Sequence, residues 1–96
     1  MPVSTQQQIL QVLANFTDIE QVILYGSRAM GREKPGSDID LVIVGEDFSH
    51  LQLLQLLTAL DELLLPYSFD ISRLQDINNA DLLAHIQRVG KIFYQR

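Results

Sequence analysis

The sequence predicts an α/β (α+β) sandwich in which helices pack against a small mixed β-sheet. Two observations lead to this fold class. Apolar runs with β-branched residues at 22–25 and 41–44 are bounded by small or polar residues, as strands are. A leucine-rich stretch at 51–64 instead has apolar residues at helical spacing. We expect the order helix, strand, strand, helix, strand, helix and a short last strand, within one domain spanning residues 1–96.

The first half is predicted to contain one helix and two strands. Ser4 or Thr5 can cap the helix, and residues 21–25 form a strand that ends at a glycine. A short helical turn at 27–31 and a loop at 33–37 lead to the second strand at 38–44, which is apolar on both faces and therefore central. The inward face of the helix carries Ile9, Leu13 and Phe16.

The second half is predicted to contain two helices with a strand between them. Ser49 can cap a helix that runs to about Leu64, and residues 67–71 form the third strand. Asn78 or Asn79 can cap the last helix, which ends at a glycine before a short strand at 91–94. The inward face of the last helix carries Leu82, Leu83, Ile86 and Val89.

Composition excludes several classes of protein. The net charge is −5 and the seven basic residues are scattered, so free nucleic acid is not an expected ligand. Cysteine is absent, which excludes a disulfide framework and a thiolate metal site. No apolar run reaches membrane-spanning length, and the first residues do not resemble a signal peptide. We therefore expect a cytoplasmic protein.

Three carboxylates are the most informative residues for function. Asp38 and Asp40 open the second predicted strand and share one face, because strand side chains alternate. Asp70 lies within the third predicted strand, and all three converge if the two strands are neighbours. One interpretation is that Asp38 caps the loop while Asp40 faces solvent at a sheet edge. A cluster of three is costly without cations, however, and would suit Mg²⁺.

Other polar residues are weaker candidates. Arg28 directly follows a small-residue turn and either contacts phosphate or is a solvated residue. Arg32 and Lys34 are expected on the loop surface. His50 and His85 fit exposed helix positions, and nothing near them in sequence indicates a base.

The predicted helix within residues 50–65 contains more leucine than one buried stripe requires. Leu51, Leu54 and Leu65 fall partly off the face that would pack on the sheet. The segment is either a wide core face or an exposed patch that buries against another chain. The expected core face carries Leu53, Leu56, Leu57, Leu60 and Leu64.

The motif between residues 26 and 41 resembles that of a known family. Gly26 and Ser27, residues 28–37, the pair Asp38 and Asp40, and a later strand aspartate resemble the polymerase-β-like nucleotidyltransferase superfamily. The short chain and the run from Ser37 to Leu41 look most like its minimal members, the MNT-domain proteins.

The resemblance implies a role for each residue of the motif. Gly26, Ser27 and Arg28 would bind the nucleotide. The carboxylates of Asp38, Asp40 and Asp70 would be catalytic and would bind two Mg²⁺ ions. ATP would be the substrate, and AMP would be transferred to a hydroxyl group with release of pyrophosphate.

The same resemblance implies a partner protein. Minimal nucleotidyltransferases commonly lack a domain that binds the acceptor, and they are often paired with a helical protein of the HEPN type. The HEPN protein can be a toxin, and the MNT protein an antitoxin that adenylylates one of its tyrosines. Two alternatives remain: a non-catalytic antitoxin that covers its partner with the leucine-rich helix, and transfer to a small molecule. A homo-oligomer or hetero-oligomer through segment 50–65 fits either role.

Overall fold

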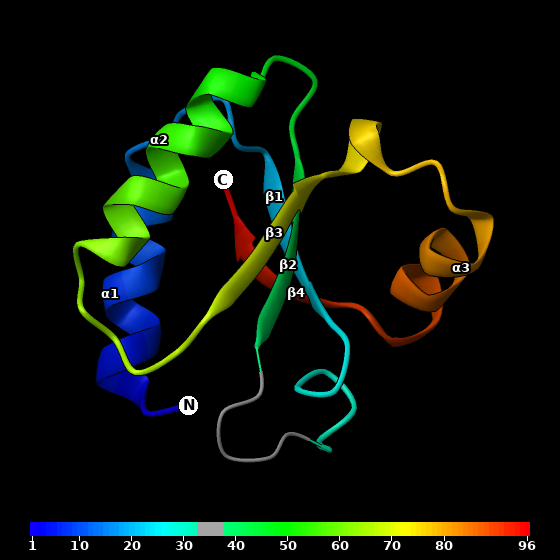
Figure 1. The fold of residues 1–96 in the computed structure, drawn as a ribbon, viewed down its shortest axis with the longest axis horizontal. Coiled ribbons are helices and arrows are strands. Elements are labelled where there is room, and N and C mark those ends of the chain that lie inside the picture. The colour runs from blue at the N-terminus through cyan, green and yellow to red at the C-terminus, as the bar shows by residue number, and fades with distance from the viewer. Residues whose placement is uncertain (33–37) are drawn as a thin grey trace.

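The computed structural model describes residues 1–32 and 38–96 and contains a four-stranded mixed sheet flanked by helices (Figure 1). The predicted order of elements is confirmed, with one short 3-10 helix added after the third strand. The predicted loop at 33–37 lies outside the described residues. The elements are α1 Val3–Ala14, β1 Gln21–Tyr25, β2 Ile39–Val44, α2 His50–Asp61, β3 Phe69–Arg73, η1 Leu74–Asp76, α3 Ala80–Val89 and β4 Lys91–Gln95.

The sheet has the strand order β3-β2-β1-β4 and is mixed because of one parallel pair. Strand β2 pairs antiparallel with β1 and parallel with β3, and β1 pairs antiparallel with β4. The prediction that the second strand is central is confirmed. Its buried apolar residues are Ile39, Leu41, Val42 and Ile43.

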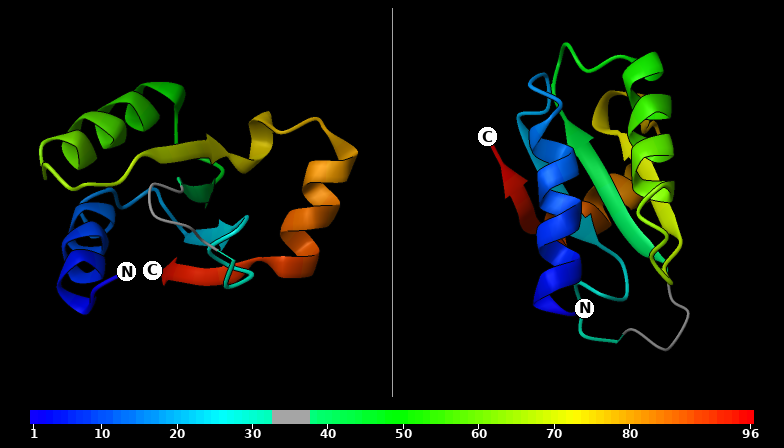
Figure 2. Two further views of the ribbon diagram at one scale, coloured as in Figure 1. Left: turned by 60° about the horizontal axis from the view of Figure 1, so that its bottom comes forward. Right: turned by 90° about the vertical axis from the view of Figure 1, so that its left-hand side faces the viewer.

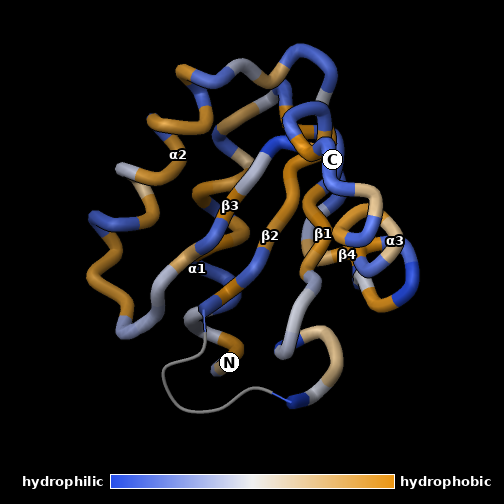
Figure 3. The backbone as a smooth tube through the Cα atoms, turned by 45° about the vertical axis from the view of Figure 1, so that its right-hand side comes forward, coloured by the Kyte–Doolittle hydropathy of each residue, from blue (hydrophilic) through white to orange (hydrophobic). Residues whose placement is uncertain are grey.

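Helices cover both faces of the sheet. Helices α1 and α2 lie on one face and α3 lies on the other (Figures 1 and 2). Ile39, Leu41 and Ile43 of β2 belong to the larger apolar cluster, formed with α1 and α2. Val42 belongs to a smaller cluster with Tyr25 and with Ile86 of α3. The tube in Figure 3 shows both central strands coloured as hydrophobic along most of their length.

The predicted start of the first helix is wrong. Helix α1 begins at Val3, with Pro2 at the N-cap and no side-chain cap hydrogen bond, so Ser4 and Thr5 lie inside the first turn. Proline suits this boundary because its φ is fixed near the observed −61°. Phe16 lies beyond the end of α1 but still packs against the core, with its ring edge-to-face on Phe48 at 6.1 Å.

The start of α2 is predicted correctly and its end is not. Ser49 forms a capping box: Gln52 donates its N–H to the Ser49 hydroxyl at 3.1 Å, and the Gln52 side chain accepts the Ser49 N–H at 2.8 Å. The helix ends at Asp61, and Leu64 has φ 55° and is 88% exposed rather than buried. Pro66 disfavours helical backbone at Leu65, which instead packs partly buried against the core. Strand β3 spans Phe69–Arg73, so it begins two residues later than the predicted range of 67–71.

The last helix and strand agree with the sequence. Asn79, rather than Asn78, caps α3 by accepting the N–H groups of Asp81 and Leu82 at 2.9 and 3.1 Å. The helix ends at Gly90, and β4 follows as predicted. In the described part of the chain, no helix has the length and apolar character needed to span a bilayer.

Candidate functional site

A tight turn at the end of β1 forms one wall of the candidate site. Gly26 has φ 77°, a conformation that glycine adopts without steric cost. A Cβ atom at Gly26 would collide with the Asp40 carboxylate, so the backbone of the turn packs directly against that side chain. Arg32 donates its N–H to the Ser27 carbonyl at 2.8 Å, and Met30 donates to the Gly26 carbonyl at 3.3 Å. The predicted helical turn is therefore a compact turn held by its own backbone.

The pairing of the strands brings Asp40 and Asp70 together. In the parallel register of β2 and β3, Asp40 is directly opposite Asp70, and on its other side it is opposite Tyr25 of β1. Asp38 precedes β2 by one residue and is exposed. Because Asp38 and Asp40 are two residues apart, extended backbone directs both to the same side. That side is the α3 face, since the neighbours Ile39 and Leu41 pack against α1 and α2.

The surroundings of Asp40 raise its affinity for protons. The pKa of Asp40 is raised by burial and by the negative charges of Asp70 and Asp38, while the positive charges of His85 and Arg28 oppose this rise. The pKa of Tyr25 is raised to about 12, mainly by burial and to a smaller extent by the negative charges of Asp70 and Asp40. The site is therefore a place where negative charge accumulates next to a buried phenol.

The donor set fits a hard divalent cation. Carboxylate oxygens are the ligands that Mg²⁺ prefers, and a cation would offset the repulsion that raises the pKa of Asp40. The packing of the Gly26 backbone against Asp40 leaves this carboxylate next to a turn rather than next to a bulky side chain. Among the described residues, no three His, Asp or Glu side chains are already gathered into a metal cluster.

The two arginines of the turn are placed differently. Arg28 is half-buried, and its guanidinium carbon lies 5.0 Å from the centre of the Tyr67 ring. This cation–π contact ties the turn to the segment before β3, so Arg28 is not the solvated residue of one interpretation. Its predicted contact with phosphate stays a prediction. Arg32 is exposed, as expected.

His85 is the residue of the site that sequence reasoning missed. It was expected to be exposed, but it is half-buried on α3 and its ring meets the Tyr25 ring edge-to-face, with centroids 6.3 Å apart. The spacing gave a signal for its burial but not for its contact with Tyr25, because His85 lies three residues after Leu82 and four before Val89, on the side of the helix expected to face inward. His50 is exposed as expected.

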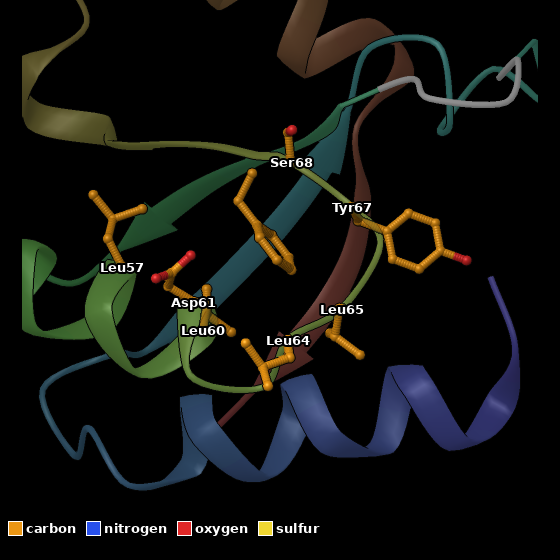
Figure 4. Close-up of a pocket in the computed structure, with 8 residues that line it drawn as sticks. Leu57, Leu60, Asp61, Leu64, Leu65, Tyr67 and Ser68 are labelled. Carbon is orange, nitrogen blue, oxygen red and sulfur yellow. The ribbon is translucent and has the colours of Figure 1, made fainter.

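A pocket on the α2 side is separate from the carboxylates. It has a volume of about 520 Å³ and lies between the end of α2 and the segment leading to β3 (Figure 4). Leu57 and Leu60 line it from α2, while Tyr67 and Ser68 line it from the connection. The pocket is thus on the sheet face opposite α3.

Part of the leucine-rich segment is exposed. Leu51 and Leu54 of α2 are 64% and 48% exposed, as expected for residues off the core face. Leu53, Leu56 and Leu60 are buried, which confirms the core part of that face. The segment therefore has both a core face and an outward apolar strip.

Comparison with protein families gives one match over most of the chain. The family model described as "Polymerase beta, Nucleotidyltransferase" matches residues 7–96. No curated protein matches the chain.

Solved structures with the same fold come from toxin–antitoxin complexes. The chain is similar to a chain of a toxin–antitoxin crystal structure with AMP-PNP, with TM-score 0.76 and 20% identity over 95% of this chain and 73% of the other. It also resembles a chain in a complex of a tri-AMPylated Shewanella oneidensis HEPN toxin with an MNT antitoxin, with TM-score 0.71 and 18% identity over 100% and 74% of the two chains. A third similar structure is the toxin–antitoxin MntA-HepT, with TM-score 0.69 and 18% identity over 99% and 74%. At these identities the likeness establishes the fold.

Proposed function

Because the chain belongs to the polymerase beta nucleotidyltransferase family, we propose that it transfers AMP from ATP to a hydroxyl group on a HEPN-type partner protein. The acceptor we propose is a tyrosine of that partner, so that the chain acts as an antitoxin. The observation that carries this proposal is the register of the sheet, which sets Asp40 opposite Asp70 and beside the Gly26 turn. The expected resemblance to this family is confirmed by the match over residues 7–96.

The turn at Gly26 and Ser27 is the proposed phosphate-binding element. It has left-handed backbone at its first residue and a hydroxyl at its second, and backbone N–H groups in such turns make concave anion sites. Arg28 is proposed to add positive charge to this region, since its charge already acts on Asp40. The turn would hold the polyphosphate end of ATP against the carboxylate side of β2.

The carboxylates are proposed to position and deprotonate the acceptor. Asp38, Asp40 and Asp70 would hold Mg²⁺, which when bound neutralises charge on the phosphate oxygens. The acceptor oxygen forms a bond to the α-phosphorus, and the bond from that phosphorus to the bridging oxygen breaks. Pyrophosphate leaves with the electron pair, and the hydroxyl proton passes to the Asp70 carboxylate.

The partner is proposed from the structural neighbours and from the exposed leucines. One neighbouring complex contains AMP-PNP, and another contains an AMPylated HEPN toxin with its MNT antitoxin. The outward strip of α2 at Leu51 and Leu54 is the surface we propose for binding a partner chain. This surface lies away from the carboxylates, so binding and chemistry are separable by mutation.

The test is transfer of radioactive AMP from α-labelled ATP to a HEPN-type protein in the presence of Mg²⁺. The wild-type chain is expected to label the partner, and the double variant Asp38→Asn/Asp40→Asn is expected to leave it unlabelled. Equal labelling by both would reject the proposed catalytic role. If the double variant fails to label the toxin but still neutralises it fully, the result would favour the non-catalytic alternative instead.

The identity of the acceptor is tested in the same assay. Mass spectrometry of the labelled partner is expected to locate AMP on a tyrosine. A reaction in which only a small hydroxyl compound is labelled would support transfer to a small molecule.

A further inference from the structure

Helix α3 brings His85 to the β1 side of the site. The His85 ring lies against the ring of Tyr25 with an interplanar angle of 81°, and Tyr25 is the residue immediately before the Gly26 turn. Tyr25 is also the β1 partner of Asp40 in the sheet register. His85 therefore lies next to the phosphate turn and next to the central carboxylate at once.

The order of the strands places His85 and Asp70 on opposite sides of Asp40. Asp70 is on β3, on one side of β2, whereas β1 with its turn lies on the other side, beneath α3. In an in-line displacement, the attacking and leaving groups lie on opposite sides of the phosphorus. If Asp70 receives the proton of the attacking hydroxyl, the leaving pyrophosphate lies on the side of β1 and His85.

The polyphosphate needs donors on that side, because the site is acidic. The positive charges that act on Asp40 come from His85 and Arg28, and the guanidinium of Arg28 lies over Tyr67. An imidazole carries at least one N–H donor in either protonation state, so it can serve a phosphate oxygen at any pH of interest. The ring of His85 is only half-buried, which leaves part of it accessible to a ligand.

We propose that His85 is a nucleotide-binding residue that donates a hydrogen bond to the β- or γ-phosphate of the bound nucleoside triphosphate. This inference rests on the nucleotide-binding part of the proposed function. The simpler interpretation is that His85 only packs its ring on Tyr25. The two interpretations differ in what phenylalanine would do at position 85, because phenylalanine keeps the ring and removes the donors.

The experiment measures binding of AMP-PNP with Mg²⁺ by titration calorimetry. His85→Phe is expected to weaken binding about 10-fold, the size of one lost hydrogen bond to a charged group. His85→Gln, which retains a donor, is expected to stay within about 3-fold of wild type. AMP lacks the β- and γ-phosphates, so its affinity is expected to be the same for all variants. His50→Gln, at an exposed position of α2, is the matched control.

A second readout uses the unaltered protein. The chain has two histidines, so NMR signals of the imidazole rings report on the site and on a control in one sample. Addition of AMP-PNP and Mg²⁺ is expected to shift the His85 signals and not those of His50. Unmoved His85 signals would overturn the inference even if a His85 variant fails to fold.

Two results would overturn the inference: wild-type affinity of His85→Phe for AMP-PNP, or unmoved His85 signals in the presence of bound AMP-PNP. Equal weakening of AMP and AMP-PNP binding would also reject a contact to the terminal phosphates. The proposed function can be rejected independently of this inference. It is rejected if no partner is labelled while AMP-PNP binding still depends on His85, and in that case the inference stands.

Discussion

The two faces of the central strand are built for opposite purposes. Ile39, Leu41 and Ile43 point to α1 and α2 and are fully buried, whereas Asp40 points to the α3 face and lies beside Asp70 and Tyr25. Two helices cover the first face, and one helix covers the second (Figure 1). The apolar face supplies stability that offsets the cost of gathering carboxylates on the other. Mutations of adjacent residues in β2 should therefore separate stability from activity.

The largest expected effect is on activity, from Asp40→Asn. We expect transfer of AMP to fall at least about 1000-fold, corresponding to about 4 kcal/mol of transition-state stabilisation. The free energy of unfolding, measured by urea denaturation without divalent cations, should rise at neutral pH. The reason is that a raised folded-state pKa means that ionised Asp40 destabilises the fold. Reduced stability together with retained transfer would show that Asp40 is structural.

The neighbouring residue should show the reverse pattern. Leu41→Ala removes a fully buried side chain from the α1 and α2 face and is expected to cost about 2–5 kcal/mol of unfolding free energy. Transfer per folded molecule should stay close to that of wild type. Urea denaturation and an assay corrected for the folded fraction measure the two quantities, and a specific loss of catalysis would contradict the separation of the faces.

Gly26→Ala tests the close packing of the turn against the carboxylate. An alanine at φ 77° costs about 1–2 kcal/mol, and its Cβ would also displace Asp40. Gly31→Ala is the matched control, because Gly31 has φ 69° while a Cβ there meets none of the described atoms within 4 Å. Both variants should lose similar stability, and only Gly26→Ala should lose nucleotide binding in addition. Equal nucleotide affinity of the two variants would mean that the contact with Asp40 has no function.

The smallest expected effect is the late ionisation of Tyr25. Its pKa is raised to about 12 by burial and by Asp70 and Asp40, so the folded state disfavours the tyrosinate. Stability is complete below the ordinary pKa near 10 and is lost as the pH rises from there toward 12. Tyrosinate absorbance followed against pH in EDTA should contain a late step that Tyr25→Phe removes and that Asp70→Asn moves to lower pH. A wild-type curve unchanged by Tyr25→Phe would contradict this placement.

Local sequence signals predicted most elements of the fold. Apolar runs with β-branched residues located β1 and β2, and Ser49 and Asn79 cap their helices as their side-chain chemistry indicates. The predicted end of α2 was wrong because leucine spacing continues to Leu64, whereas the helix ends at Asp61 and Leu64 has left-handed backbone with φ 55°. The spacing of apolar residues indicates which side chains can share a helix face, but it does not indicate at which residue the helix ends.

The site was only partly predictable, because its geometry is non-local. That Asp40 and Asp70 meet depends on the parallel pairing of β2 with β3, which sequence reasoning stated as a condition. His85 lies beside Tyr25 through the return of α3 over β1, a contact between residues 60 positions apart that has no local signature. The roles of these residues in binding and catalysis remain predictions.

The position of Asp70 has a consequence for the size of the acceptor. Strand β3 is the outer strand on its side of the sheet, and the Asp70 side chain is exposed. A reacting group can therefore approach from beyond the sheet border without displacing any described helix. The proposed acceptor hydroxyl can therefore belong to a bulky molecule, a folded protein included, because Asp70 lies at the border of the sheet.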